Sequence, residues 1–193
     1  MKNLFNLLIA ALMITAVSCN SNNKPKDSTE AATDTNEKKL DAKDSTEVVD
    51  DAKYAVEAAN GGMLEVELGK LAQNKAISPA VMKFANMMVA DHTKANNELK
   101  TLAASKKISL PTTLGEKFQK DYDDFSKMKR EDFDKAYTDY MVKDHKEDIE
   151  EFKKEANDGK DPDLKAFANK HVPILEHHLL MAQQANDAVK NKK

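Results

Sequence analysis

From about residue 50 onward, apolar residues recur with a period near 3.6, and no segment alternates apolar and polar residues with period two. The pattern predicts four long helices, at roughly 50–75, 79–105, 131–157 and 162–190. Pro79 and Pro162 stand at first helical positions, directly behind Ser78 and Asp161, which suit the N-cap. Gly159 follows the third helix as a stop signal.

The connections between these helices predict their order in space. The first and second helices, and the third and fourth, are joined by a few residues, so each pair is expected to form an antiparallel hairpin. About two dozen residues separate the second helix from the third. They contain a capping box at 113–116 that opens a short amphipathic helix with Leu114, Phe118, Tyr122 and Phe125. We therefore predict an all-α fold, a ferritin-like four-helix bundle with a short extra helix in the link between helices 2 and 3.

The N-terminus has the features of a bacterial lipoprotein signal. Lys2 precedes an apolar run at 4–16 that is too short to remain as a membrane-spanning helix. Cys19, the only cysteine of the chain, follows small residues and resembles a lipobox cysteine, which implies cleavage of 1–18 and lipidation of Cys19. The alternative is an ordinary secreted protein with an odd cysteine.

Asn, Lys, Asp, Ser and Thr dominate the next segment, 20–46, which has almost no large apolar side chain. Such a segment cannot bury enough surface to offset its ordering entropy. We expect residues 19–49 to be a lipidated cysteine followed by a disordered tether, and residues 50–193 to form the bundle. The formal net charge is −3 with both signs mixed, which argues against nucleic-acid binding.

One ionisable side chain interrupts the apolar stripe of each long helix: Glu65, His92, His145 and His178. Glu65 lies on a stripe of small residues whose glycines suggest close approach of a neighbouring helix. At about 1.5 Å of rise per residue, the four fall near the middle of helices about 40 Å long, whether the two hairpin turns lie at the same end or at opposite ends. His171 lies nearer to its helix start. It joins this layer if both turns lie at one end, and less well if they lie at opposite ends.

A Glu and His layer inside a helical bundle is the kind of site that binds iron or manganese in ferritin-like proteins. The usual di-metal pattern needs a Glu three residues before a His, and here Val89, Val142 and Leu175 occupy those positions. The pattern therefore argues against a carboxylate-bridged di-iron centre, and the hypothesis is a mononuclear His-rich site for Fe, Zn, Cu or Mn, held by the four residues of the layer. Asp91 and Asp144 are further oxygen donors or partners that orient the imidazoles.

Two alternatives to a metal site remain. The layer is a set of core residues that hydrogen-bond one another, since buried polar groups need partners in either case. Otherwise the residues face the surface because the register differs. No glycine-rich phosphate loop and no nucleophile elbow is present, so the sequence gives no sign of covalent catalysis.

Four segments of the chain resemble the DUF4142 family of exported bacterial proteins. They are AANGGMLEVELGKLA at 58–72, FANMMVADHTKANNELKTLAASK at 84–106, FDKAYTDYMVKDHKEDIEEFKKEANDGKDPDLKAFA at 133–168 and PILEHHLLMAQ at 173–183. The resemblance covers about 58–189 and implies a ferritin-like fold without an established activity. The four residues of the layer match the family's characteristic polar positions, while His177 stands where relatives often carry another residue.

Our main interpretation is a lipid-anchored protein of the cell envelope with a binding or structural role rather than catalysis. The alternative is a transition-metal-binding or metal-dependent redox protein that uses the mid-bundle layer. A third class is an adaptor whose charged helix faces recruit an unknown protein partner. Because Asn20 rather than Asp follows Cys19, the outer membrane is favoured over the inner one, with the domain facing the periplasm or the cell surface.

Overall fold

The computed structural model describes residues 26–40 and 46–191, which form six α-helices and no strand. The helices are α1 (Ser28–Leu40), α2 (Thr46–Lys75), α3 (Pro79–Ser105), α4 (Glu116–Lys127), α5 (Arg130–Asp158) and α6 (Pro162–Lys190). The four long helices predicted from the sequence correspond to α2, α3, α5 and α6. The predicted bounds of α3 and α6 are confirmed, and α2 begins earlier than predicted. In this part of the chain, no helix is long and apolar enough to cross a membrane.

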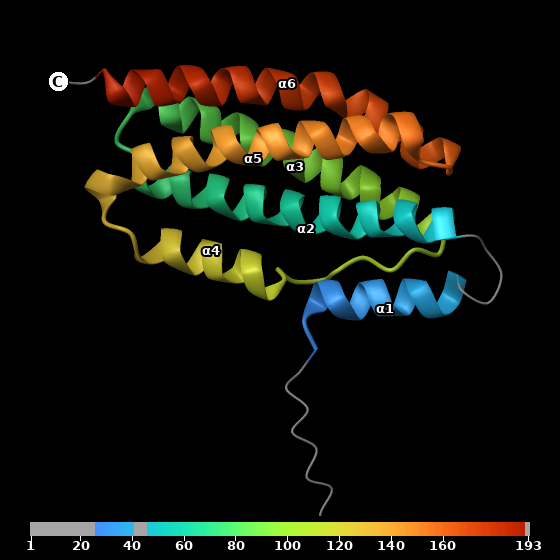
Figure 1. Cartoon of the computed structure of the whole chain (residues 1–193). Helices are drawn as coiled ribbons and strands as arrows, with labels where there is room; N and C mark the ends of the chain where they lie inside the picture. Colours follow the sequence, from blue (N-terminus) through green and yellow to red (C-terminus); the bar gives the residue numbers. More distant parts are fainter. Residues whose placement is uncertain (1–25, 41–45, 192–193) are drawn as a thin grey trace, which may run out of the picture.

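The four long helices pack side by side as two hairpins, α2 with α3 and α5 with α6 (Figure 1). The α3 helix also packs on α6, and α2 packs on α5, which closes the arrangement around a common interior. The two hairpin turns lie at opposite ends of the molecule, and the segment between α3 and α5 returns along the outside of α2 (Figure 1). The long link therefore carries the chain from one end of the helices to the other.

The apolar stripes of the long helices form the interior, as their period predicts. The largest buried apolar side chains include Phe84, Phe133 and Tyr137. On α2, a Cβ atom added at Gly69 would lie 2.7 Å from Cγ2 of Val89, so glycine allows α3 to approach closely there. The expected close approach at this glycine stripe is thus confirmed.

The prediction of a disordered tether over residues 19–49 is wrong for Ser28–Leu40, which forms α1. This helix packs on α2 and lies in line with α4 along the same side of the molecule (Figure 1). It buries little apolar surface, but the amide of Asn36 bonds both backbone groups of Ser109, at 2.9 and 2.7 Å. Polar contacts of this kind cannot be predicted from the pattern of hydrophobic residues. The predicted signal peptide and Cys19 lie outside the described residues.

The helix ends agree only partly with the sequence. Asp161 caps α6 by accepting from the backbone N–H groups of Asp163 and Leu164, as predicted. The predicted capping box at 113–116 is wrong, because Gly115 is the N-cap of α4 and no side chain of its own segment caps it. Asp27, just before α1, accepts from the backbone N–H of Glu116 instead. A distant segment therefore supplies this cap.

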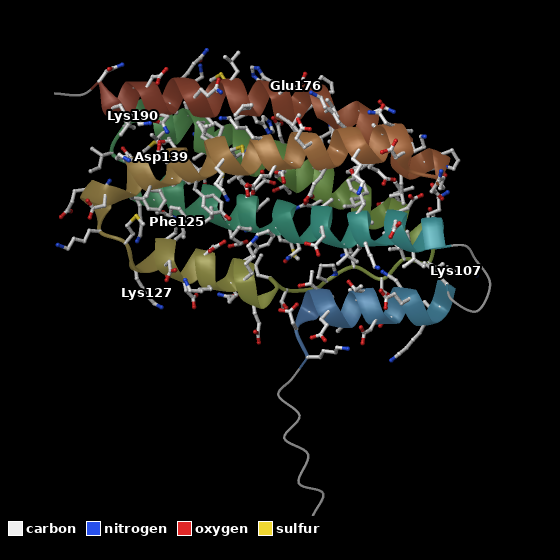
Figure 2. All side chains as sticks on the ribbon, in the orientation of Figure 1. Lys107, Phe125, Lys127, Asp139, Glu176 and Lys190 are labelled. Carbon is white, nitrogen blue, oxygen red and sulfur yellow. The ribbon has the colours of Figure 1, made fainter. Side chains whose placement is uncertain are left out.

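Ser78 occupies the N-cap of α3, but its side chain makes no capping hydrogen bond. The backbone N–H groups of Ile77 and Ser78 donate instead to the carboxylate of Asp134 on α5, at 2.7 to 3.2 Å. Asp139 of α5 similarly binds Asn186 at 2.6 Å and Lys190 at 3.2 Å, which joins α5 to the end of α6 (Figure 2). Carboxylates of α5 thus fix the helix ends at one end of the molecule.

Candidate metal centre

The packing of α2, α3, α5 and α6 brings Glu65, His92, His145 and His178 into one buried cluster. Their exposed fractions are 2, 6, 0 and 1 %. The three imidazole rings have centroid separations of 5.0 to 5.8 Å. One ring nitrogen from each histidine lies within 4.8 Å of one from each of the other two. The layer predicted from the four interrupted stripes therefore exists, and its residues face inward.

Each imidazole has one nitrogen engaged by a hydrogen-bond acceptor. Nδ1 of His92 lies 2.7 Å from Oε2 of Glu65, and Nε2 of His178 lies 3.0 Å from Oδ2 of Asp91. Nδ1 of His145 lies 3.0 Å from the carbonyl oxygen of Met141. Because carboxylates and carbonyls only accept, these three nitrogens carry the protons. The second nitrogen of each neutral ring keeps its lone pair.

The second nitrogens of His92 and His178 face each other, and that of His145 faces Glu65. Nε2 of His92 lies 3.2 Å from Nδ1 of His178. Nε2 of His145 lies 3.5 Å from Oε1 of Glu65, and neither of these buried atoms has a hydrogen-bond partner. Two acceptors that face each other repel unless a cation lies between them. The cluster thus has a place for a positive ion, either an additional proton or a metal.

Two separations in the cluster match the spacing of ligand pairs on a tetrahedral ion. Two ligand atoms at about 2.1 Å from the same tetrahedral ion are about 3.4 Å apart. The 3.2 Å between His92 and His178 and the 3.5 Å between His145 and Glu65 both match this value. A histidine that binds a metal almost always donates its other N–H to a carboxylate or a backbone carbonyl, as all three do here.

The electrostatics of the cluster keep its ligand atoms in the required protonation states. Burial lowers the pKa of His145 to about 4, against the attraction of Glu65. Burial also lowers the pKa of His178, an effect that His92 increases. Burial opposes ionisation of Glu65, but the three imidazoles outweigh it and hold the pKa of that carboxyl below its ordinary value. Burial therefore favours the neutral form of His145 and His178, and the imidazoles favour the ionised form of Glu65.

A cavity of about 410 Å³, lined by residues of α2, α3, α5 and α6, reaches the cluster. Glu65, His92 and His178 line one part of it, and Phe152 and Phe167 line the apolar part. Gly61 also lines this cavity, and a Cβ atom added there would meet nothing within 4 Å. The cavity between the helices gives small solutes access to the cluster.

The other polar residues singled out in the sequence take different places. Asp91 contacts His178 rather than its neighbour His92, because adjacent residues of a helix do not face each other. Nδ1 of His171 donates to the carbonyl of Phe167, and its Nε2 lies 3.9 Å from Glu98, so His171 stands outside the layer on the cavity wall.

Asp144 lies beside the cluster together with Asp148, a residue that was not predicted from the sequence. One oxygen of each lies within 4.8 Å of ligand atoms of Glu65 and His145. Burial and then the charge of Glu65 raise the pKa of both aspartates well above its ordinary value. Their spacing of four residues places them on one helix face, which is the signal that identifies the pair.

The chain belongs to the family described as "Domain of unknown function (DUF4142)", which matches residues 33–185. This match includes Glu65 and all three histidines of the cluster, and it begins within α1. No curated protein and no solved structure matches the chain. The family description assigns no activity, so the function has to be argued from the cluster itself.

Proposed function

We propose that this protein binds a divalent transition-metal ion through His92, His145, His178 and Glu65. The convergence of three imidazole lone pairs, each with its other nitrogen held by an acceptor, is the observation that supports this function. Three imidazoles and one carboxylate suit zinc, iron or copper, and their spacing favours a tetrahedral ion such as Zn²⁺. The surrounding helices then form a ferritin-like four-helix bundle that holds the ligands at mid-length.

A purely structural layer accounts less well for the same contacts. It leaves Oε1 of Glu65 and Nε2 of His145 buried without a partner. A buried unsatisfied polar group costs about 1–3 kcal/mol, so two of them are a substantial penalty in a marginally stable domain. A bound ion satisfies both atoms and also fills the gap between His92 and His178.

The experiment measures bound metal per chain. The full chain, without a polyhistidine tag, is offered Mn²⁺, Fe²⁺, Cu²⁺ and Zn²⁺ in turn, dialysed and analysed by plasma mass spectrometry. We expect about one equivalent of at least one ion, and a melting temperature that falls when EDTA removes it. His178→Ala should abolish this binding. His177→Ala is the matched control, because His177 is the exposed neighbour on the same helix.

Metal content well below one equivalent for every ion offered would contradict the proposal. Equal losses in His177→Ala and His178→Ala would contradict it as well, because only His178 belongs to the cluster. His92→Leu separates the two accounts further. In a structural layer this change costs little or stabilises the fold, whereas in a metal centre it removes the metal-dependent part of the stability.

We further propose that the protein acts at the bacterial cell envelope, held to a membrane by a lipid on Cys19. The support is the sequence of the N-terminus alone, an apolar run followed by small residues and a single cysteine. Cys19→Ala should move the protein from the membrane fraction to the soluble fraction of a bacterial host that processes lipoproteins. Unchanged membrane association of this variant would refute the anchor.

A further inference from the structure

Asp144 and Asp148 form a second group of potential ligands beside the histidine cluster. One turn of α5 separates them, and both carboxylates are partly buried. Their oxygens, Nε2 or Nδ1 of His145 and an oxygen of Glu65 all lie within 4.8 Å of one another. Glu65 therefore belongs to two overlapping groups, because its Oε2 accepts from His92 in the histidine cluster.

Neither aspartate has a partner that offsets its charge. Within the described residues, no side chain makes an ion pair or a hydrogen bond with Asp144 or Asp148. Lys117 and Lys143 act on Asp144 only at longer range, and their effect is smaller than that of burial and of the neighbouring carboxylates. Two partly buried carboxylates without a base are costly unless protons or a cation neutralise them.

Two divalent ions would offset the charges of Glu65, Asp91, Asp144 and Asp148. One ion in the histidine cluster offsets Glu65 and Asp91, which leaves Asp144 and Asp148. Glu65 contributes an oxygen to this second group, and its Oε1 is buried without a hydrogen-bond partner. A carboxylate oxygen has two lone pairs, so Oε1 can bind one ion on each side. The single lone pair of His145 serves only one ion, and we assign it to the histidine cluster.

We propose that Asp144, Asp148 and Oε1 of Glu65 form a second, oxygen-rich cation position that shares Glu65 with the histidine cluster. This inference deepens the proposed function, because Glu65 then bridges the two ions. Three carboxylates select hard divalent cations such as Mn²⁺, and water completes the coordination. A hollow of about 320 Å³ between α2, α4 and α5, lined by Asp144, Asp148 and Tyr140, gives access for the cation and this water.

Manganese titration followed by electron paramagnetic resonance tests the second position, because free and bound Mn²⁺ have different spectra. The full chain is titrated with Mn²⁺ both before and after loading with one equivalent of Zn²⁺. We expect the zinc-loaded protein to bind about one Mn²⁺ per chain. The double variant Asp144→Asn, Asp148→Asn should weaken Mn²⁺ binding at least about tenfold and retain one Zn²⁺.

The control is Asp121→Asn combined with Glu147→Gln, because both residues line the hollow outside the ligand group. This control should leave the affinity for Mn²⁺ within about threefold. Asparagine is close in shape to aspartate and carries no charge, so the double variant should melt at or above the temperature of the unchanged protein.

The titration separates the failure of this proposal from the failure of the histidine centre. A zinc-loaded protein that binds no Mn²⁺, or binds it equally well in the Asp144, Asp148 variant, overturns the second position and leaves the first intact. Mn²⁺ binding that depends on Asp144 and Asp148, in a protein whose histidine cluster takes up none of the four ions offered, supports the second position and overturns the first.

Discussion

Nε2 of His92 and Nδ1 of His178 face each other across 3.2 Å, while the opposite nitrogens of both rings are engaged by Glu65 and Asp91. The row of side chains Glu65, His92, His178 and Asp91 thus contains three contacts. Each contact needs a proton to form a hydrogen bond. Two neutral imidazoles supply only two protons. The third contact needs one more positive charge, which either a proton or a metal ion can supply. Metal binding and proton release should therefore be coupled.

Metal binding should release about one proton per ion in mildly acidic solution, and fewer as the pH rises, because burial lowers the pKa of His178. The contact between His92 and His178 needs a third proton when no metal is bound, and a metal ion takes the place of that proton while the two outer N–H groups stay bound. Calorimetric titration with Zn²⁺ in buffers of different ionisation enthalpy measures this number. A heat of binding that does not depend on the buffer would show that no proton is released and would contradict the assigned protonation.

Asp91→Asn should weaken metal binding by about 10- to 100-fold while one ion per chain still binds at saturation. The amide no longer holds the N–H of His178 as strongly as the carboxylate does, so the ring loses its fixed orientation. Competition with a chromophoric chelator measures the affinity. Asp187→Asn, an exposed change on α6, is the control and should leave the affinity unchanged. Equal affinities for all three proteins would rule out the role assigned to Asp91.

Two glycines of α2 should respond in opposite ways to the same substitution. Gly61→Ala should stabilise the protein by about 0.5–1 kcal/mol, because alanine favours the helix and its Cβ meets nothing within 4 Å. Gly69→Ala should destabilise it by about 1–3 kcal/mol, because its Cβ would lie 2.7 Å from Val89. Chemical denaturation of both variants measures the free energies of unfolding. The same sign for both changes would contradict the packing of α2 on α3.

Glu155 should make the stability fall as the pH rises. Burial and the charge of Asp51 raise the pKa of Glu155 to about 7, above its unfolded value. The folded state therefore disfavours the ionised form, so stability is highest below the unfolded pKa and declines as the pH rises toward about 7. Glu155→Gln should remove a decline on the order of 1–2 kcal/mol between about pH 4.5 and pH 8.

Urea unfolding at several pH values measures this effect, with the exposed Glu150→Gln on the same helix as the control. The slope of stability against pH should change in Glu155→Gln and stay unchanged in the control. Identical slopes in all three proteins would mean that Glu155 ionises freely in the folded state.

The hydrophobic pattern predicted the parts of the fold that depend on apolar burial. The stripes on α3 and α6 gave the bounds of these helices, and the residues that interrupt the stripes gave the layer of Glu65, His92, His145 and His178. A helix with an apolar face has one buried side, so a polar residue on that face points inward wherever the helix packs. The four residues of the cluster could therefore be predicted from the sequence.

The parts that could not be predicted depend on polar contacts between distant segments. The α1 helix is attached through Asn36 and Ser109, and the cap of α4 comes from Asp27. The side-chain directions of Asp91 and Asp148 follow from how α3 and α5 are rotated against their neighbours. Helical periodicity shows on which face of its helix a carboxylate lies. It does not determine which residue of the neighbouring helix that carboxylate contacts.

Anomalous X-ray diffraction at the zinc absorption edge, on crystals of the zinc-loaded full chain, tests the metal centre most directly. The account predicts one strong anomalous peak about 2.1 Å from Nε2 of His92, Nε2 of His145 and Nδ1 of His178, with Oε1 of Glu65 as the fourth ligand. A cluster without a peak, or a peak bound only by other residues, would contradict it.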